Sequence, residues 1–229
     1  MKKFNKRIRI FLVVVVLVFS CFLYLMMIDT SKSKKKEVGD TLEDQFLKEV
    51  IYLEKSTSNQ DHELDLSSMN LMILNEIILD VKQTVAHDTG LSQNDLDKLF
   101  QKFHQKLKEK TYYDSELITE RKKMKEYKIQ VYGIDLTGFL KQLKQEIQQL
   151  KEMKTEEKAS FLNQLFSRQI ATISVKKEPV ILSLKFKKRN DKWQIDSSQF
   201  DVLNIYLGFY TGESNLLALK GMMNSLDFK

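Results

Sequence analysis

Residues 180–196 read VILSLKFKKRNDKWQID, and this stretch is the clearest structural signal in the chain. Its first residues alternate, with Val180, Leu182, Leu184 and Phe186 on one side and Ile181, Ser183, Lys185 and Lys187 on the other. Alternation with a period of two is typical of a β-strand that buries one face. Arg189-Asn190-Asp191 can then turn the chain into a shorter strand over 192–196. Because Trp193 and Ile195 share a face there, the stretch predicts a β-hairpin.

A second hairpin is predicted upstream of the first. Residues 116–122 and 127–132 have the composition of two strands, separated by a polar turn over 123–126. In the later strand Tyr127, Ile129 and Val131 fall on one face. This face should therefore be the buried one.

Helical periodicity accounts for most of the remaining chain. The expected helices cover residues 41–55, 65–86, 92–110, 136–150, 155–170, 200–210 and 216–226. Ser92 and Asp95 resemble a capping box at the start of the third helix. The segment 65–86 is the most apolar of these helices, so much of its circumference must be covered. Helices, a hairpin, two helices and another hairpin predict an α+β domain with an antiparallel sheet packed on helices.

The N-terminus carries a different pattern. Residues 10–28 are nineteen uncharged, mostly apolar residues, with Lys2, Lys3, Lys6, Arg7 and Arg9 in front of them. A helix of that length would reach roughly 28 Å, close to the hydrocarbon thickness of a bilayer. We therefore expect a cytoplasmic basic tail (1–9), a transmembrane signal-anchor (10–28), a juxtamembrane tether (29–39) and an extracytoplasmic α+β domain (40–229). Within that domain, 40–110 would be a helical part and 111–229 a mixed α/β part.

Two alternatives to a retained anchor are a cleaved signal peptide and a lipoprotein. The apolar run has no Ala-x-Ala-like exit, which argues against cleavage. Residues 18–21 (VFSC) loosely resemble a lipobox with Cys21 as the lipidated residue, but Phe19 fits poorly among the small residues of such motifs. The simpler interpretation of Cys21 is a small apolar residue within a membrane helix.

The charge balance bears on the possible partners. The chain has 37 basic and 31 acidic residues, which gives a net charge of +6. Nine of the basic and two of the acidic residues lie within residues 1–39, so residues 40–229 contain 28 basic and 29 acidic residues. The basic excess therefore flanks the membrane segment, where Lys and Arg interact with lipid headgroups. We expect membrane lipids as partners of residues 10–28 and their flanks, and no nucleic acid.

The second half of the chain resembles a family of small extracytoplasmic proteins and lipoproteins of low-GC Gram-positive bacteria, known mostly as domains of unknown function. The resemblance rests on YKIQVYGID (127–135), on the charged helical pair that follows over 136–173, and on KKRNDKWQID (187–196). It implies a cystatin-like (nuclear-transport-factor-2-like) fold, in which a curved antiparallel sheet wraps round a helix. That fold sometimes contains a cone-shaped ligand pocket but has no single function.

Few residues point to chemistry. His62, His87 and His104 are scattered over a loop, a helix end and a helix and do not cluster as metal ligands would, so no metal or cofactor is expected. Glu76 and Asp80, four residues apart on the apolar helix, form the best acid pair and would line a pocket, although a solvated helix edge explains them as well. No Gly-rich phosphate loop and no Gly-x-Ser-x-Gly motif occurs in the sequence.

Other candidates have structural explanations. Asp135 is expected to cap the helix after it, and Trp193 to anchor the core rather than stack on a ligand. Tyr112-Tyr113 and Phe209-Tyr210 are candidates for exposed aromatic patches.

The sequence favours a single-pass membrane protein whose external module is not an enzyme and binds a protein partner. It would be an accessory part of an envelope, secretion or conjugation machine. A small-ligand pocket with minor lyase or isomerase activity, and a secreted or lipidated factor, are the alternatives. The sequence gives no indication of the oligomeric state.

Overall fold

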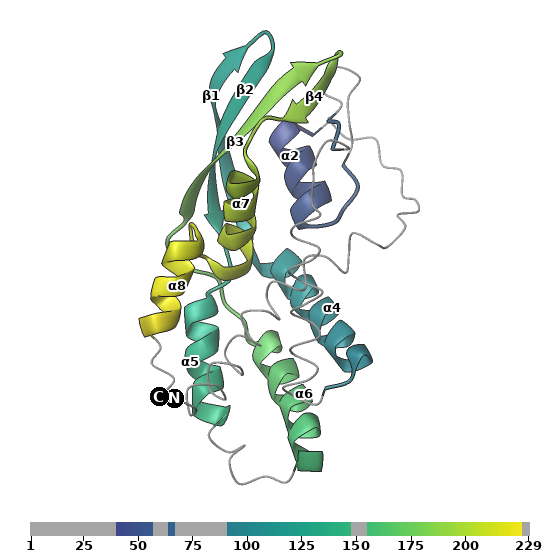
Figure 1. The fold of residues 1–229 in the computed structure, drawn as a ribbon, viewed down its shortest axis with the longest axis vertical. Helices are drawn as coiled ribbons and strands as arrows, with labels where there is room; N and C mark the ends of the chain where they lie inside the picture. Colours follow the sequence, from purple (N-terminus) through teal and green to yellow (C-terminus); the bar gives the residue numbers. More distant parts are fainter. Residues whose placement is uncertain (1–39, 57–63, 67–90, 148–154, 226–229) are drawn as a thin grey trace, which may run out of the picture.

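The computed structural model describes residues 40–56, 64–66, 91–147 and 155–225 (Figure 1). The predicted anchor over 10–28 and most of the apolar helix over 65–86 lie outside these ranges. Among the helices that the structure does describe, none combines the length and the apolar composition that crossing a bilayer requires.

A four-stranded antiparallel sheet, ordered β1-β2-β3-β4, forms one layer of the molecule. Its strands are β1 (Tyr112–Arg121), β2 (Met124–Tyr132), β3 (Val180–Arg189) and β4 (Lys192–Ile195). Both predicted hairpins are present, and the predicted inward faces are confirmed: Ile129, Val131, Leu184 and Phe186 are fully buried. This confirms the α+β class with helices packed on an antiparallel sheet.

The first hairpin is longer than the sequence indicated. The predicted turn at 123–126 was wrong, because only residues 122–123 turn, and Met124 already pairs with Arg121. The charged residues Lys125 and Glu126 are part of strand β2, and each has a side-chain partner on a neighbouring strand. Lys125 forms an ion pair with Glu120, and Glu126 accepts a hydrogen bond from Ser183 on the neighbouring strand. Cross-strand pairs of this kind stabilise a strand that its polarity would otherwise disfavour.

Five long helices are described beside the sheet. They are α4 (Gln93–Lys110), α5 (Leu136–Ile147), α6 (Thr155–Ala171), α7 (Gln199–Thr211) and α8 (Leu216–Ser225). Ser92 caps α4 by accepting a hydrogen bond from the backbone N of Asp95, as predicted. Ser198 and Asp201 form a complete capping box on α7.

The first helical segment is shorter than the predicted 41–55. It consists of α2 (Leu42–Phe46), capped by Thr41, and a π-helical continuation η2 (Leu47–Ile51). The wider π-helical turn keeps Leu47, Val50 and Ile51 in the core, and the chain then leaves the helix through Leu53, whose φ is +55°. A residue with a left-handed backbone cannot continue a right-handed helix, so the helix ends before Leu53. The apolar periodicity of the sequence extends to Leu53, and for this reason the helix was predicted too long.

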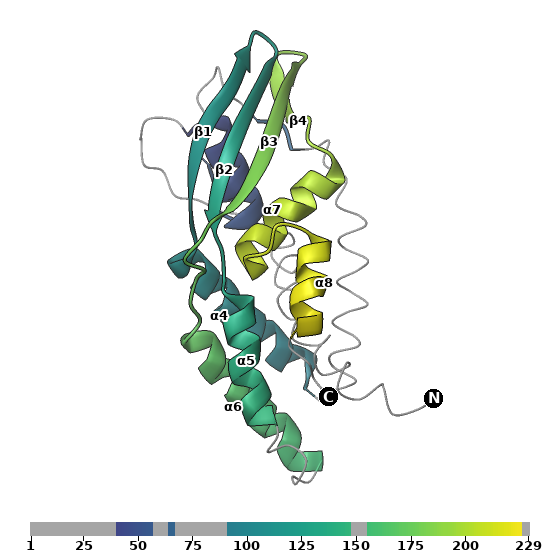
Figure 2. The same cartoon turned by 90° about the vertical axis from the view of Figure 1, so that its left-hand side faces the viewer.

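Helices cover the inner face of the sheet and extend it at one end. α2 and α7 lie against that face, while α4, α5 and α6 lie beyond the end at which β1 begins (Figures 1 and 2). The opposite face of β1, β2 and β3 is not covered by any of the described helices (Figure 2). The sheet is therefore of the kind that has one face in the core and one in solvent.

Candidate functional site

The predicted site residues are distributed over separate parts of the molecule. Glu76, Asp80, Cys21, His62 and His87 lie outside the described residues, so the acid pair and the lipidation site keep the status of predictions. Asp135, Trp193 and His104 are described. The structure does not bring these three together, and each lies in a different contact of the scaffold.

Asp135 precedes α5. Its carboxylate Oδ1 accepts a hydrogen bond from the backbone N of Gly138 at 2.9 Å, which is the geometry of a helix N-cap. Its own backbone N donates to the carbonyl O of Ser174. Asp135 thus joins the start of α5 to the segment that leads into β3.

Trp193 on β4 is only 4% exposed. The ammonium of Lys125 lies 5.5 Å from its ring centroid, and the backbone O of Trp193 accepts a hydrogen bond from Asp65. The backbone of Trp193 therefore pairs with the segment at residues 64–66, while its ring is buried and faces the ammonium of Lys125. This placement leaves little of the ring surface available for stacking on a ligand.

His104 is buried on α4. Its Nε2 donates to the backbone O of Tyr52 at 3.2 Å, and its Nδ1 accepts from the hydroxyl of Tyr210 at 3.4 Å. One donor and one acceptor nitrogen define a neutral imidazole. Burial lowers the pKa of His104 to about 4, although the bond to Tyr52 opposes that shift. The residue links α4, η2 and α7.

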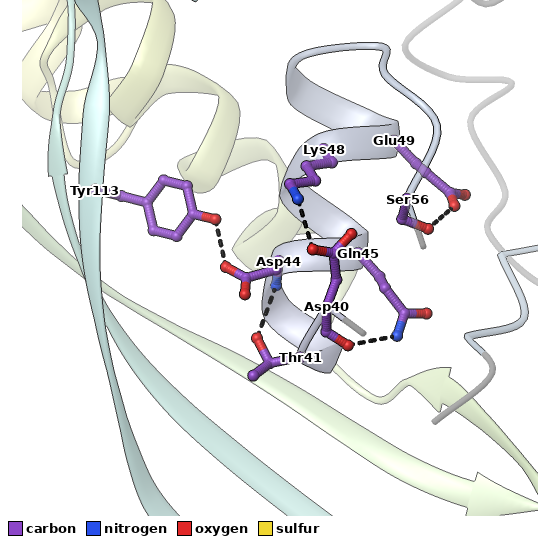
Figure 3. A network of polar contacts seen from close by, with 8 residues as sticks. All are labelled: Asp40, Thr41, Asp44, Gln45, Lys48, Glu49, Ser56 and Tyr113. Atoms are coloured by element: carbon purple, nitrogen blue, oxygen red, sulfur yellow. Dashed lines mark hydrogen bonds and ion pairs between the residues drawn. The ribbon is translucent and has the colours of Figure 1, made fainter. Parts of the chain in front are cut away.

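Two acids that the sequence did not single out lie between α2 and β1. Glu43 is 4% exposed, and its Oε1 accepts a hydrogen bond from the hydroxyl of Ser115 at 3.0 Å. Asp44 accepts one from the hydroxyl of Tyr113 at 2.5 Å (Figure 3). Burial raises the pKa of Glu43, against the hydrogen bonds from its own backbone, Thr41 and Ser115. Burial, followed by the bond to Asp44, raises the pKa of Tyr113.

These acids are placed to attach α2 to the sheet. The second carboxylate oxygen of Glu43 is buried and has no hydrogen-bond partner among the described residues. Glu43 is 4% exposed, and its hydrogen bond from Ser115 joins α2 to β1. In the sequence, the two acids belong to the segment LEDQF of an amphipathic helix. An acid next to Leu42 in such a helix normally faces solvent, so the sequence did not indicate that Glu43 is buried.

In the described part of the chain, no three or more His, Cys, Asp or Glu side chains gather as metal ligands would. The most conspicuous remaining feature is the uncovered face of the sheet. There Tyr112 is 51% exposed and stacks on Tyr132 with 4.4 Å between ring centroids. Ile181 is 61% exposed and pairs with Gln130 in the next row. We call Tyr112, Asp114, Gln130, Tyr132 and Ile181 the outer patch.

The outer patch only partly matches the predicted aromatic patches. Tyr112 is exposed, but its neighbour Tyr113 points inward to Asp44. Phe209 and Tyr210, the other candidates for an exposed aromatic patch, are both buried on α7. Phe209 contacts the rings of Tyr52 and Tyr113, and Tyr210 stacks on Phe103 of α4.

The fold defines an α+β domain built on an antiparallel sheet with helices on one face. The chain belongs to the family described as "Domain of unknown function (DUF5105)", which matches residues 49–210. No curated protein matches the chain. Within the family match lie all four strands and α4 to α7, but not α2.

Among solved structures, the chain is similar to the crystal structure of YcdA from Bacillus subtilis, a protein described as a candidate lipoprotein. The two are 14% identical with a TM-score of 0.50, and the match covers 73% of this chain and 54% of YcdA. This chain therefore spans about half the length of that protein. At such low identity the likeness concerns the fold alone. The expected resemblance to lipoproteins of unknown function is confirmed at this level, while neither comparison addresses the cystatin-like class.

Proposed function

We propose that this protein is a membrane-anchored module of the bacterial cell envelope that binds another envelope protein through the outer patch and has no catalytic activity of its own. The single observation that carries the proposal is the stacked pair Tyr112 and Tyr132 beside Ile181 on the uncovered face of the sheet.

The location outside the cytoplasm is supported by two independent facts. YcdA, to which the fold is similar, is described as a candidate lipoprotein. In this chain, residues 10–28 have the length and composition of a membrane anchor and follow a basic tail. The retained single-pass anchor and the lipidation of Cys21 would both hold the domain at the membrane, and the intact mass of the mature protein distinguishes them.

The composition of the outer patch favours a protein as the partner. Tyrosine is enriched at protein interfaces, because its ring supplies apolar area while the hydroxyl remains hydrogen-bonded. Asp114 and Gln130 lie in the next row of the register and would provide the polar contacts around the rings. The exposed Ile181 adds apolar surface next to the two rings, and a protein partner could bury this surface.

The proposal that the module is not an enzyme rests on three polar groups that are buried or partly buried. Glu43, Asp44 and His104 each hold elements of the scaffold together, with hydrogen-bond partners on neighbouring elements. The alternative of a ligand pocket requires Glu76 and Asp80, and no contact of the described residues favours it. A cystatin-like class for the sheet and its helices also remains a proposal.

The test is site-specific photo-crosslinking in intact cells that produce the full chain. A photoreactive amino acid replaces Ile181 in one variant and Ser160, an exposed residue of α6, in the control. We expect a discrete adduct from position 181, absent from position 160, and lost when Tyr112→Ser and Tyr132→Ser are added. The absence of any adduct at 181, or equal adducts at both positions, would contradict the proposal.

A further inference from the structure

The two hairpins end side by side at the same end of the molecule, the top of Figure 1. The first turns at residues 122–123 and the second at Asn190 and Asp191. The backbone N of Lys188 donates to the carbonyl O of Lys123 at 2.9 Å, which joins the two ends. We call residues 120–126 and 185–196 the hairpin tips.

The hairpin tips concentrate positive charge. They contain nine Lys or Arg and four Asp or Glu, whereas the rest of residues 40–229 contains 19 basic and 25 acidic residues. The exposed basic side chains of the tips are Arg121, Lys122, Lys123, Lys185, Lys187, Arg189 and Lys192. The two groups are about 60 positions apart in the sequence, and the pairing of β2 with β3 brings them together. A nearly neutral domain therefore has one strongly basic end.

The acids in the hairpin tips do not remove this excess. Glu120 pairs with Lys125, Glu126 with Lys185, and Asp196 with Arg189 at 3.8 Å. Most of the tip cations are nevertheless exposed to solvent. The exposed large apolar side chains of the described residues all lie elsewhere. A partner of the hairpin tips must therefore be recognised by negative charge rather than by apolar contact.

The direction of α2 shows where the chain enters the domain. Glu43 contacts Ser115 in the middle of β1, whereas the hydroxyl of Tyr52 lies near Thr111, just before β1. Since β1 runs toward the hairpin tips, α2 and η2 run away from them, and the N-terminal end of α2 faces the tips (Figure 1). Residues 29–39 precede it and contain four lysines. Eleven residues span at most about 40 Å.

We propose that the hairpin tips dock on the anionic phospholipid surface of the membrane that holds the N-terminal segment. This inference rests on the proposed anchoring of the chain. A short tether that enters at the tip-facing side keeps the basic end within reach of that membrane. Each cationic side chain close to an anionic bilayer strengthens the association about five-fold. The attraction is confined to a Debye length, roughly 8–10 Å at physiological salt, so the hairpin tips must approach the headgroups closely.

The experiment uses the full chain reconstituted into vesicles of phosphatidylcholine, with and without phosphatidylglycerol. A dye is attached at Met124→Cys in a Cys21→Ser background, and its quenching by a headgroup-labelled lipid reports contact of the hairpin tips. A second labelled variant, Ser160→Cys, reports on the opposite end of the domain. The charge variant replaces Lys122, Lys123, Lys187 and Arg189 by Gln, and the matched control replaces Lys98, Lys110, Lys141 and Lys177 by Gln. Circular dichroism verifies that each variant is folded.

We expect quenching at position 124 that is several-fold greater on anionic than on neutral vesicles and that falls in 0.5 M salt. It should be lost in the charge variant and kept in the matched control, with no quenching at position 160. Equal quenching on both lipids, no quenching, or equal loss in both variants would overturn the inference.

Flotation separates this inference from the anchoring on which it rests. A chain that floats with both kinds of vesicle but shows no quenching at position 124 is anchored and not docked. A chain that floats only with anionic vesicles supports docking and contradicts the anchor. A chain that floats with neither contradicts both.

Discussion

His104 is held as a neutral imidazole between α4, η2 and α7, and its pKa of about 4 lies below the ordinary value of 6.5. Between these two values the unfolded chain binds a proton that the folded chain does not. The free energy of unfolding should therefore decrease as the pH falls from about 6.5 to 4, by roughly 3 kcal/mol from this residue. Urea unfolding at pH 7, 5.5 and 4 measures the decrease.

The control for this prediction is His104→Gln, whose amide can still donate to the Tyr52 carbonyl but does not titrate. The variant will be less stable at pH 7, because Gln cannot reproduce both hydrogen bonds of the ring. Its free energy of unfolding should change less with pH than that of the wild type. If both proteins lose the same stability between pH 7 and pH 4, His104 does not carry the pH dependence.

Glu43 gives the opposite sign. Burial raises the pKa of its carboxyl group, so the folded chain holds a proton that the unfolded chain releases. Its contribution to stability is present at low pH and decreases as the pH rises above the ordinary value of 4.5 toward the raised one. We expect Glu43→Gln to raise the urea midpoint at pH 7 and to have little effect at pH 4. A lower midpoint at pH 7 would show that the charged carboxylate stabilises α2 on β1.

At the scale of elements, the turn between β3 and β4 depends on two left-handed residues. Asn190 and Asp191 have φ values of +49° and +62°, which are those of a type I′ turn. Asn tolerates this conformation, whereas Ala is disfavoured in it by about 1 kcal/mol. Asn190→Ala should therefore destabilise the domain by about that amount in thermal unfolding, and Asn190→Gly should not. Equal effects of the two substitutions would indicate that the Asn side chain matters through its hydrogen bonds.

The same hairpin shows why periodicity predicts some elements well. Strand β3 alternates with a period of two because one of its faces is buried, and that pattern is local to ten residues. The turn at 123–126 was mispredicted because Lys125 and Glu126 are charged, which favours a turn in the sequence. In the folded chain, contacts with Glu120 and Ser183 on the neighbouring strands stabilise them within β2. The helix at 41–55 was predicted too long for a related reason. Its apolar residues reach the core through a π-helical turn, which sequence periodicity does not indicate.

The candidate site was less predictable than the fold. Glu43 is buried because Ser115, 72 residues later, lies opposite it in the folded chain. The basic excess of the hairpin tips likewise depends on the register between β2 and β3, so the nearly neutral total for residues 40–229 concealed it. Contacts between distant residues determine both features, and a single sequence does not reveal such contacts.

At the scale of the whole molecule, the sheet and α7 are joined by a close contact of two glycines. The backbone N of Ile134 donates to the carbonyl O of Phe209, and a Cβ at Gly133 would lie 1.7 Å from the carbonyl O of Gly208. No side chain fits there, and the obstacle is backbone that cannot move aside without separating α7 from β2. Gly133→Ala should therefore destabilise the domain by about 3 kcal/mol, comparable to the larger effects of overpacking.

Gly221→Ala is the matched control for this contact. A Cβ at Gly221 would meet nothing within 4 Å, and the residue lies within α8. Because Ala favours a helix over Gly by roughly 0.8–1.0 kcal/mol, this variant should raise the melting temperature. The same substitution thus has opposite signs at two positions, and differential scanning calorimetry measures both. If Gly133→Ala left the melting temperature unchanged, α7 would not be held against β2 at this distance, and the buried arrangement of Phe209 and Tyr210 would also be wrong.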